Sequence, residues 1–342
     1  MNRQHWDTLL AVVAGERVDP VPVGFIIDSP WLPNWAGMTL LDYFASESRW
    51  LEANRRALDR FPEVLFLPGF WSEFGMCTEP SAFGSRPVWE EDTFPFAEPV
   101  LGSTEGIADL ARPDPARHGL PPLVLKRLAH ARPAIEEAGH AIRFAVARGP
   151  LNVAAFLMGS TEFLMAIKTE PDRIHTLLAT VTDFLLDWLR LQAETFETID
   201  GIFLLDDIVG FLGEDDFQAF AKPYLAKAFG AMEARVRFFH NDAPGRVCAP
   251  HLAQVGVNLF NFSHEHSLAE MKEWTGRQVA LVGNIPPRDV LASGTPDDVR
   301  DAVRAALDGV EDTTRLILSC GGGMPPGAGT ENIEAFVEAA RA

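Results

Sequence analysis

The chain alternates between short apolar runs and longer stretches in which apolar residues recur at helical spacing. Apolar runs of about five residues bounded by turn residues indicate buried strands, whereas apolar residues three or four apart indicate amphipathic helices. Eight such runs end near residues 27, 68, 147, 205, 239, 262, 282 and 319. Because strands alternating with helices favour a parallel sheet, eight repeats predict an α/β fold of the (β/α)8, or TIM barrel, type.

Three further segments complete the predicted architecture. Residues 2–15 predict a helix before the first strand, so the barrel carries an N-terminal helical extension. Residues 39–60 keep helical spacing and predict one long helix, whereas residues 76–103 are rich in Pro, Gly and acidic groups. We expect the latter to be an excursion over the barrel, as a small β-element or a lid. Because no linker interrupts the pattern, residues 1–342 are interpreted as one domain.

Composition and charge argue against several classes of function, among them nucleic-acid binding and membrane binding. The net charge of −19 argues against binding to nucleic acids or anionic membranes, since both require a basic face. The apolar runs are far shorter than the roughly 20 residues that cross a bilayer. Three scattered cysteines do not make a disulfide framework, and they favour a reducing, cytoplasmic location. We therefore expect a small-molecule substrate, and a homodimer stays an open alternative for the assembly.

The ends of three predicted strands carry groups that bind metals. His240 and Asp242 lie two residues apart, so their side chains point to the same side of the fifth strand. His264 follows the sixth strand and Cys320 ends the eighth. Imidazole, carboxylate and thiolate on the rim where barrels place their chemistry predict a zinc site. The alternative is that these are ordinary hydrogen-bonding groups, with Cys320 a small buried hydrophobe.

Other residues at strand ends are candidates for catalysis and cofactor binding. Asp206 and Asp207 end the fourth strand and could position a substrate or act as a base, or could cap the helix beginning near Glu214. Arg148 ends the third strand, Asn284 the seventh, and Gly322 lies in a glycine-rich loop that a ligand could approach closely. Asp28 and Glu73 are further rim candidates. A group of aromatic residues could line a pocket for a flat ligand, or could instead pack in the core: Trp31, Trp35, Phe70, Trp71 and Phe74.

Four segments resemble the uroporphyrinogen decarboxylase superfamily. They are GERVDPVPV, ARGPLNVAAFLMG, GNIPPRDVLASGTPDDVRDAV and LILSCGGGMPPGAGTENIEAFVEAA, and the likeness runs over essentially the whole chain. The resemblance implies a (β/α)8 barrel, in agreement with the strand count. It also implies one of two activities, since the superfamily holds decarboxylases of haem synthesis and zinc-dependent cobalamin methyltransferases.

Departures from the family motifs favour the methyltransferase branch. The decarboxylases carry an RQAGR-type motif after the first strand, where this chain reads IIDSPWLPNWAG without an arginine. The similar methyltransferases carry His-x-Cys on the fifth strand and a further Cys after the eighth. Here the first motif reads His240-Asn241-Asp242, and Cys320 lies near the second. The resemblance thus implies a zinc set shifted toward nitrogen and oxygen donors, with His264 or Glu73 available to complete it.

The sequence therefore predicts a zinc-assisted methyltransferase. It would move a methyl group between a small methylated substrate, such as a methoxy compound, and a corrinoid supplied by a separate protein. Two alternatives stay open. One is a decarboxylase of a carboxylated ring, in which Asp207 or Asp242 stabilises a protonated intermediate and Arg148 holds a carboxylate. The other is a non-catalytic ligand-binding barrel.

Overall fold

The computed structural model describes residues 1–27 and 30–342. Within these ranges, eight strands run parallel, and each lies where an apolar run predicted a strand. They are β1 (Gly24–Ile26), β2 (Leu65–Leu67), β5 (Phe144–Arg148), β6 (Gly201–Leu205), β7 (Val236–Asn241), β8 (Leu259–Phe262), β9 (Ala280–Ile285) and β10 (Leu316–Cys320).

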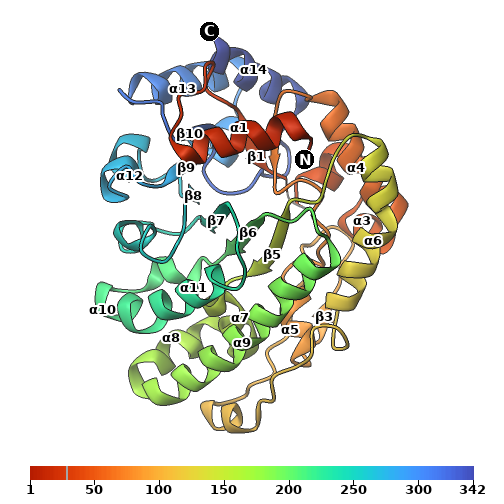
Figure 1. Ribbon diagram of the computed structural model, residues 1–342, viewed down its shortest axis with the longest axis vertical. Coiled ribbons are helices and arrows are strands. Elements are labelled where there is room, and N and C mark those ends of the chain that lie inside the picture. The colour runs from red at the N-terminus through yellow and green to blue at the C-terminus, as the bar shows by residue number, and fades with distance from the viewer. Residues whose placement is uncertain (28–29) are drawn as a thin grey trace.

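The strands are neighbours in chain order. Strands β5 to β10 form one six-stranded ladder, and β1 pairs with β2 in a second. A bridge between Val23 and Leu318 places β1 beside β10. In the part of the chain that is described, no strand pairing joins β2 to β5, so full barrel closure stays a prediction. Figure 1 shows β5 to β10 following one another, with the later helices on the outside of the sheet.

Helices follow most of the strands and cover their outer side. The α-helices are α1 (Arg3–Ala14), α2 (Leu32–Ala36), α3 (Leu40–Ala45), α4 (Glu47–Arg60), α5 (Thr78–Ala82), α6 (Pro121–Glu137), α7 (Pro150–Met158), α8 (Ser160–Thr169), α9 (Pro171–Thr195), α10 (Glu214–Asp216), α11 (Lys222–Phe229), α12 (Leu268–Trp274), α13 (Pro296–Asp308) and α14 (Thr330–Arg341). Short 3₁₀ and π-helical segments are η1 (Thr104–Asp109), η2 (Ile208–Phe211), η3 (Phe217–Ala221), η4 (Ala249–His251) and η5 (Pro287–Ala292).

Local capping explains one difference from the predicted helices. The single helix expected over 39–60 is wrong: the chain forms α3 and then α4, separated at Ser46. Ser46 has extended backbone angles, and its hydroxyl accepts a hydrogen bond from the backbone N–H of Arg49. A serine that caps a new helix competes with continuation of the old one, because it satisfies an N–H group that lacks an intrahelical partner.

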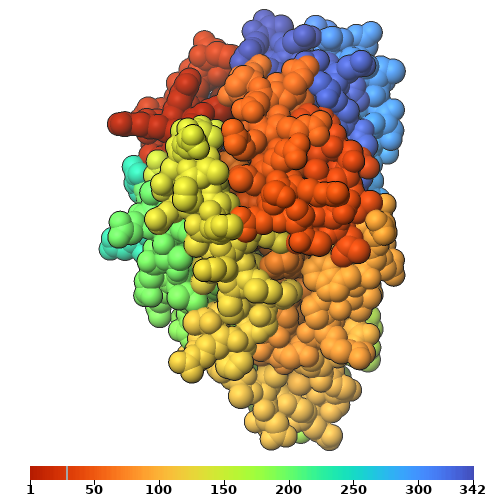
Figure 2. Space-filling view, turned by 90° about the vertical axis from the view of Figure 1, so that its right-hand side faces the viewer, coloured from red at the N-terminus to blue at the C-terminus, as the bar shows by residue number. Residues whose placement is uncertain are grey.

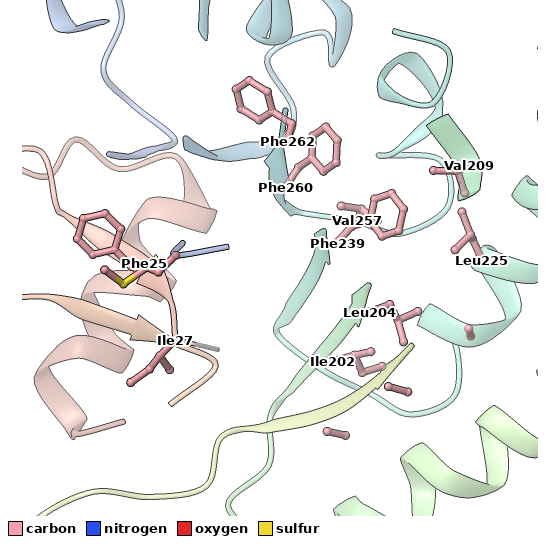
Figure 3. Packing of buried hydrophobic residues seen from close by; sticks show 14 of the residues in the cluster. Phe25, Ile27, Ile202, Leu204, Val209, Leu225, Phe239, Val257, Phe260 and Phe262 are labelled. Carbon is pink, nitrogen blue, oxygen red and sulfur yellow. The ribbon is translucent and has the colours of Figure 1, made fainter. Parts of the chain in front are cut away.

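Alternate residues of each strand pack on two different cores. In β6, Ile202 and Leu204 face the helices, whereas Phe203 and Leu205 face the barrel interior. The interior cluster also contains Trp6 and Leu9 of α1, so this helix covers the N-terminal ends of the strands. Figure 3 shows the helix-facing layer, with Ile202, Leu204, Phe239, Phe260 and Phe262 as sticks. The predicted N-terminal helical extension is therefore present, and it leaves the C-terminal strand ends as the open rim.

The segment over 76–103 contains the small β-element that its composition predicted. Strands β3 (Pro87–Val88) and β4 (Phe96–Ala97) pair antiparallel in a short hairpin. In Figure 2 the light-orange surface that includes this hairpin lies below α3 and α4, toward one end of the molecule. The ring of Trp89 contacts those of Phe44 and Phe74, which ties the hairpin to the elements after β1 and β2.

None of the described helices is by itself long and apolar enough to cross a membrane. The pair α7 and α8 reaches the length and composition of a span only when taken together, and the two are bent by 104° relative to each other.

Candidate metal centre and substrate pocket

Three side chains from β6 and β7 gather at the open rim. His240 Nε2 lies 3.7 Å from Asp207 Oδ1 and 4.0 Å from Asp242 Oδ2. In the described ranges, the donor atoms of these three residues form a group in which all lie within 4.8 Å of one another. The backbone N–H of Asp242 also donates to Asp207 Oδ1 at 3.1 Å. We call Asp207, His240 and Asp242 the rim triad.

The donor set and spacing of the rim triad suit a zinc ion. From typical zinc–nitrogen and zinc–oxygen bonds, two ligands of one tetrahedral zinc lie about 3.3 Å apart. The distances to His240 therefore need to shorten by about 0.4 Å for Asp207 and about 0.7 Å for Asp242. Burial and the negative charge of Asp207 raise the pKa of Asp242, while His240 opposes the rise. Two carboxylates this close repel each other, and a bound cation would relieve that repulsion.

Asn152, on α7, holds Asp207 in this position. Its Oδ1 accepts from the backbone N–H groups of Asp207 and Ile208, at 3.0 and 3.1 Å. Its Nδ2 donates to Asp207 Oδ2 at 3.3 Å and to the carbonyl oxygen of Leu205 at 3.2 Å. The carboxylate therefore keeps Oδ1 directed to His240. No feature of the sequence alone singled out Asn152, because its role depends on α7 packing against the end of β6.

Asp206 faces the other way and caps α7. Its two carboxylate oxygens accept from the backbone N–H groups of Leu151 at 2.8 Å and Asn152 at 3.0 Å. It is fully buried, and burial raises its pKa well above the usual range, although the two N–H donors oppose the rise. Gly149 has no side chain where a Cβ would lie 2.3 Å from Asp206 Oδ2. Asp206 therefore caps a helix, but the helix is α7 and not the one beginning near Glu214 that the sequence suggested.

His240 is held by a second asparagine, Asn261 of β8. The distance from His240 Nδ1 to Asn261 Oδ1 is 2.7 Å, and both side chains are buried. Asn261 lies inside an apolar strand, LFNF, and that buried polar position is the one sequence signal that could have identified it.

Arg148 lines a cavity beside Asp207 and His240 but already has a buried partner. Its guanidinium donates to Glu73 Oε2 at 2.8 Å and lies over the ring of Trp71, and both charged side chains are less than a tenth exposed. Its backbone N–H donates to Glu79 Oε1. Burial opposes the charge of Arg148, but Glu73 and Glu79 raise its pKa overall. Glu73 is therefore the partner of Arg148 and lies outside the rim triad.

Cys320 and His264, the other two predicted zinc ligands, do not join the rim triad. Cys320 belongs to the helix-facing core, and its thiol lies 3.6 Å from the carbonyl oxygens of Gly322 and Gly323. His264 is exposed and lines a separate polar cavity, of about 360 Å³, that it shares with Asp242.

Of the two residues predicted to contact a cofactor, Gly322 lies against the rim triad and Asn284 contacts another loop. Gly322 has a φ of +84°, and a Cβ there would lie 3.2 Å from Asp242 Oδ2, so only glycine fits without strain. The amide of Asn284 donates to the carbonyl oxygen of His266. Asp28, a further rim candidate, lies outside the described residues.

A cavity of about 160 Å³ opens beside Asp207 and His240. Its remaining lining is mostly apolar and aromatic: Pro30, Trp71, Met76, Phe94, Phe156 and Leu205, together with Glu73, Arg148 and Asn152. Of the aromatic residues singled out in the sequence, Trp71 lines this cavity. Trp31 and Phe70 lie in the helix-facing core, and Trp35 and Phe74 pack against it.

Comparison with known proteins places these features in a family. A sequence model of the family described as "Uroporphyrinogen decarboxylase (URO-D)" matches residues 4–342. The uroporphyrinogen decarboxylase of Dichelobacter nodosus is 25% identical, over 97% of this chain and 96% of that protein. A methylated-thiol–coenzyme M methyltransferase from Methanosarcina mazei is 23% identical, over 82% of this chain and 74% of that protein.

The fold itself is shared with a solved methyltransferase from Methanosarcina mazei. The two structures superpose with a TM-score of 0.80, over 97% of this chain and 96% of that chain, at 23% identity. This likeness supports the TIM-barrel type of fold assigned from the eight strands. The family model matches residues 4–342, which shows that the chain belongs to the uroporphyrinogen decarboxylase family, whose members are enzymes, either decarboxylases or methyltransferases.

Proposed function

We propose that the protein is a methyltransferase that moves a methyl group between a small methylated substrate and a corrinoid carried by a separate protein. The observation that carries this proposal is the rim triad, two of whose members, Asp207 and His240, line a small, mostly apolar cavity. The similarity to a coenzyme M methyltransferase supports the reaction class. A methoxy compound fits the site best, because nitrogen and carboxylate donors favour harder partners than a thiolate-rich site does.

Asp207, His240 and Asp242 would hold the metal. Zinc bound there would supply a Lewis acid that polarises the heteroatom carrying the methyl group. Three protein ligands leave one position open, as catalytic zinc sites do. In this assignment Asp207 serves as a ligand, oriented by Asn152, and does not act as a base. In the transfer the methyl–oxygen bond would break with its electron pair left on oxygen, the reduced corrinoid would take the methyl group, and the alkoxide would take a proton from water.

The cavity beside the rim triad would select the substrate. Its volume of about 160 Å³ lies below the 300–1,000 Å³ typical of sites for drug-sized ligands, so it suits a molecule of few atoms. Trp71, Phe94 and Phe156 offer flat apolar surfaces, whereas Asp207 and His240 are at the polar end. The methyl-bearing oxygen would face this polar end while the rest of the substrate packs on the aromatic side chains.

A decarboxylase is the second candidate, supported by the family match and the decarboxylase relatives. In that case Asp207 or Asp242 would stabilise a protonated intermediate. The cavity is poorly suited to decarboxylation, because Arg148, the residue that would hold a substrate carboxylate, already forms a salt bridge with Glu73. A polycarboxylated ring needs several unpaired cations, and a buried arginine with a carboxylate partner is largely neutralised. The third candidate, a non-catalytic barrel, predicts ligand binding without any reaction.

The proposal is tested by methyl transfer to free cob(I)alamin, used as the corrinoid probe, with methanol and small methoxyarenes as donors. We expect zinc in protein purified without added metal, and methylcobalamin formation that Asp207→Asn reduces together with the zinc content. Asp297→Asn is the matched control, because this exposed aspartate lies on α13. Release of CO₂ from uroporphyrinogen by metal-free protein would instead support the decarboxylase. Donor binding with no turnover would support the non-catalytic barrel.

A further inference from the structure

The amide of Asn261 connects four neighbouring strands at the base of the rim triad. Its Nδ2 donates to the carbonyl oxygen of Val282 on β9 at 2.8 Å and to that of Cys320 on β10 at 3.3 Å. Its Oδ1 lies 2.7 Å from His240 Nδ1 on β7. Asn261 has no exposed surface, so water does not compete for these hydrogen bonds.

These contacts determine which way the amide faces. An amide nitrogen has two protons, and here both have carbonyl oxygens as acceptors. Turning the amide over would bring Oδ1 against two carbonyl oxygens, with no proton between them, and would leave buried acceptors unsatisfied. The oxygen of Asn261 therefore faces His240.

The position of the histidine proton follows from the same geometry. An amide oxygen only accepts hydrogen bonds, so His240 must carry a proton on Nδ1. In a neutral imidazole the other ring nitrogen, Nε2, then carries the lone pair. Nε2 is the atom that faces Asp207 Oδ1 and Asp242 Oδ2, at 3.7 and 4.0 Å.

We propose that Asn261 is a positioning residue that fixes the Nδ1–H tautomer of His240 and so presents the Nε2 lone pair to a metal ion. The statement about the tautomer concerns the chain alone, whereas the statement about the metal rests on the proposed function. Partners of this kind behind a metal-binding histidine typically change metal affinity by about 10- to 100-fold. Asn261 touches neither substrate nor metal in this account and acts only through His240.

The first test measures the tautomer in metal-free wild-type protein. Histidine side chains labelled with ¹⁵N are observed by long-range ¹H–¹⁵N NMR above pH 8, and the signals of His240 are identified by their loss in His240→Gln. We expect a protonated Nδ1 and an unprotonated Nε2. A protonated Nε2 with a bare Nδ1 would overturn the proposal, and this result does not depend on any variant folding or on any metal binding.

The second test measures affinity for Co²⁺ by its visible absorption and for Zn²⁺ by competition with a chromophoric chelator. Asn261→Leu removes the acceptor and should weaken both affinities about 10- to 100-fold. Asn261→Asp keeps an acceptor oxygen for His240 but turns its second oxygen toward the carbonyl oxygens of Val282 and Cys320, so it should bind metal more tightly than Asn261→Leu at a cost in stability. The matched control is Asn258→Leu, because Asn258 directly precedes β8, three residues before Asn261 and therefore on the opposite face, and it also bonds to the backbone of Arg235 and Arg237. That control should lower stability without changing metal affinity.

The two proposals fail in different ways. If wild-type protein binds neither metal, the proposed function is wrong, and the NMR measurement still decides the tautomer. If wild-type protein binds metal and folded Asn261→Leu binds it equally well, the positioning role is wrong while the proposed function stands.

Discussion

Polar side chains on the inner face of the strand ends line the cavity, whereas those on the outer face pack toward the helices. Asp206 and Asp207 are neighbours in the chain at the end of β6 and have the same carboxylate group. Asp207, in phase with Phe203 and Leu205, lies at the mouth of the cavity with His240. Asp206, in phase with Ile202 and Leu204, is fully buried toward the helices and caps α7. One position in the alternation separates the candidate metal ligand from a structural group.

The same alternation of inward- and outward-facing positions separates the other candidate residues. Arg148 and His240 continue the inward phase of β5 and β7, and both line the cavity. Cys320 continues the outward phase of Leu316 and Leu318 on β10, and it lies in the helix-facing core. Among these strand-end candidates, the phase of the side chain therefore decides whether it faces the cavity or the helices.

The largest expected effect comes from the inward histidine. His240→Ala removes the nitrogen donor and should weaken zinc binding by more than about 100-fold, since loss of an outer partner alone costs 10- to 100-fold. Methyl transfer should fall with the metal content. Zinc affinity is measured by chelator competition and transfer by methylcobalamin absorbance. Full activity in a metal-free His240→Ala variant would show that methyl transfer does not require metal bound by this inward-facing residue.

The next effect concerns the inward arginine. Arg148→Met leaves Glu73 as a buried charge without its guanidinium partner and should lower the free energy of unfolding by about 3–5 kcal/mol. The double variant Arg148→Met with Glu73→Gln should recover much of that loss. Urea unfolding measures both, and zinc affinity should stay unchanged. Equal stability of the single and double variants would show that the pair is not coupled.

The outward aspartate should give a smaller and pH-dependent effect. Asp206→Asn places one amide N–H against a backbone N–H of α7 and should cost about 1–3 kcal/mol at neutral pH. Since burial raises the pKa of Asp206 in the folded protein, its proton is held more tightly there than in the unfolded chain. The wild-type protein should therefore lose stability as the pH rises from about 4 through that raised pKa.

This pH dependence has a direct check. Urea unfolding of wild-type and Asp206→Asn protein is compared at several pH values above 4. The difference in unfolding free energy should shrink as the pH rises, because only the wild-type protein loses a proton at this position. A difference that grows with pH would mean that the two N–H donors outweigh burial.

The smallest effect is expected at the outward cysteine. Cys320→Ala removes one buried sulfur from the helix-facing core and should cost about 1 kcal/mol of stability. Zinc affinity should not change, because the thiol faces Gly322 and Gly323. A loss of zinc affinity comparable to that of His240→Ala would show that the sulfur of Cys320 binds the metal, although it occupies an outward-facing position of β10.

The sequence predicted the strands more completely than the site. Each run ends where the apolar pattern gives way to polar or turn residues, so the strand positions followed from periodicity alone. His240 and Asp242 were paired correctly because residues two apart share a face, and the same rule links Asp207 to Leu205. Counting the alternation backward from Cys320 would have separated its side chain from theirs.

Two contributions could not be predicted from the sequence. Asn152 and Asn261 hold Asp207 and His240 through hydrogen bonds between residues 55 and 21 positions apart in the chain. Such contacts depend on how α7 packs on β6 and on how β8 is aligned with β7. Neither alignment is set by the pattern within a single segment, because register is fixed by neighbouring strands and their connections.

We expect metal binding to belong to the inward-facing rim triad and to exclude Cys320. X-ray absorption at the zinc edge of purified protein tests it most directly, because sulfur and oxygen or nitrogen neighbours differ in distance. The account predicts nitrogen and oxygen ligands at about 2.0–2.2 Å and no sulfur neighbour. A sulfur neighbour at about 2.3 Å, lost in Cys320→Ala, would contradict it.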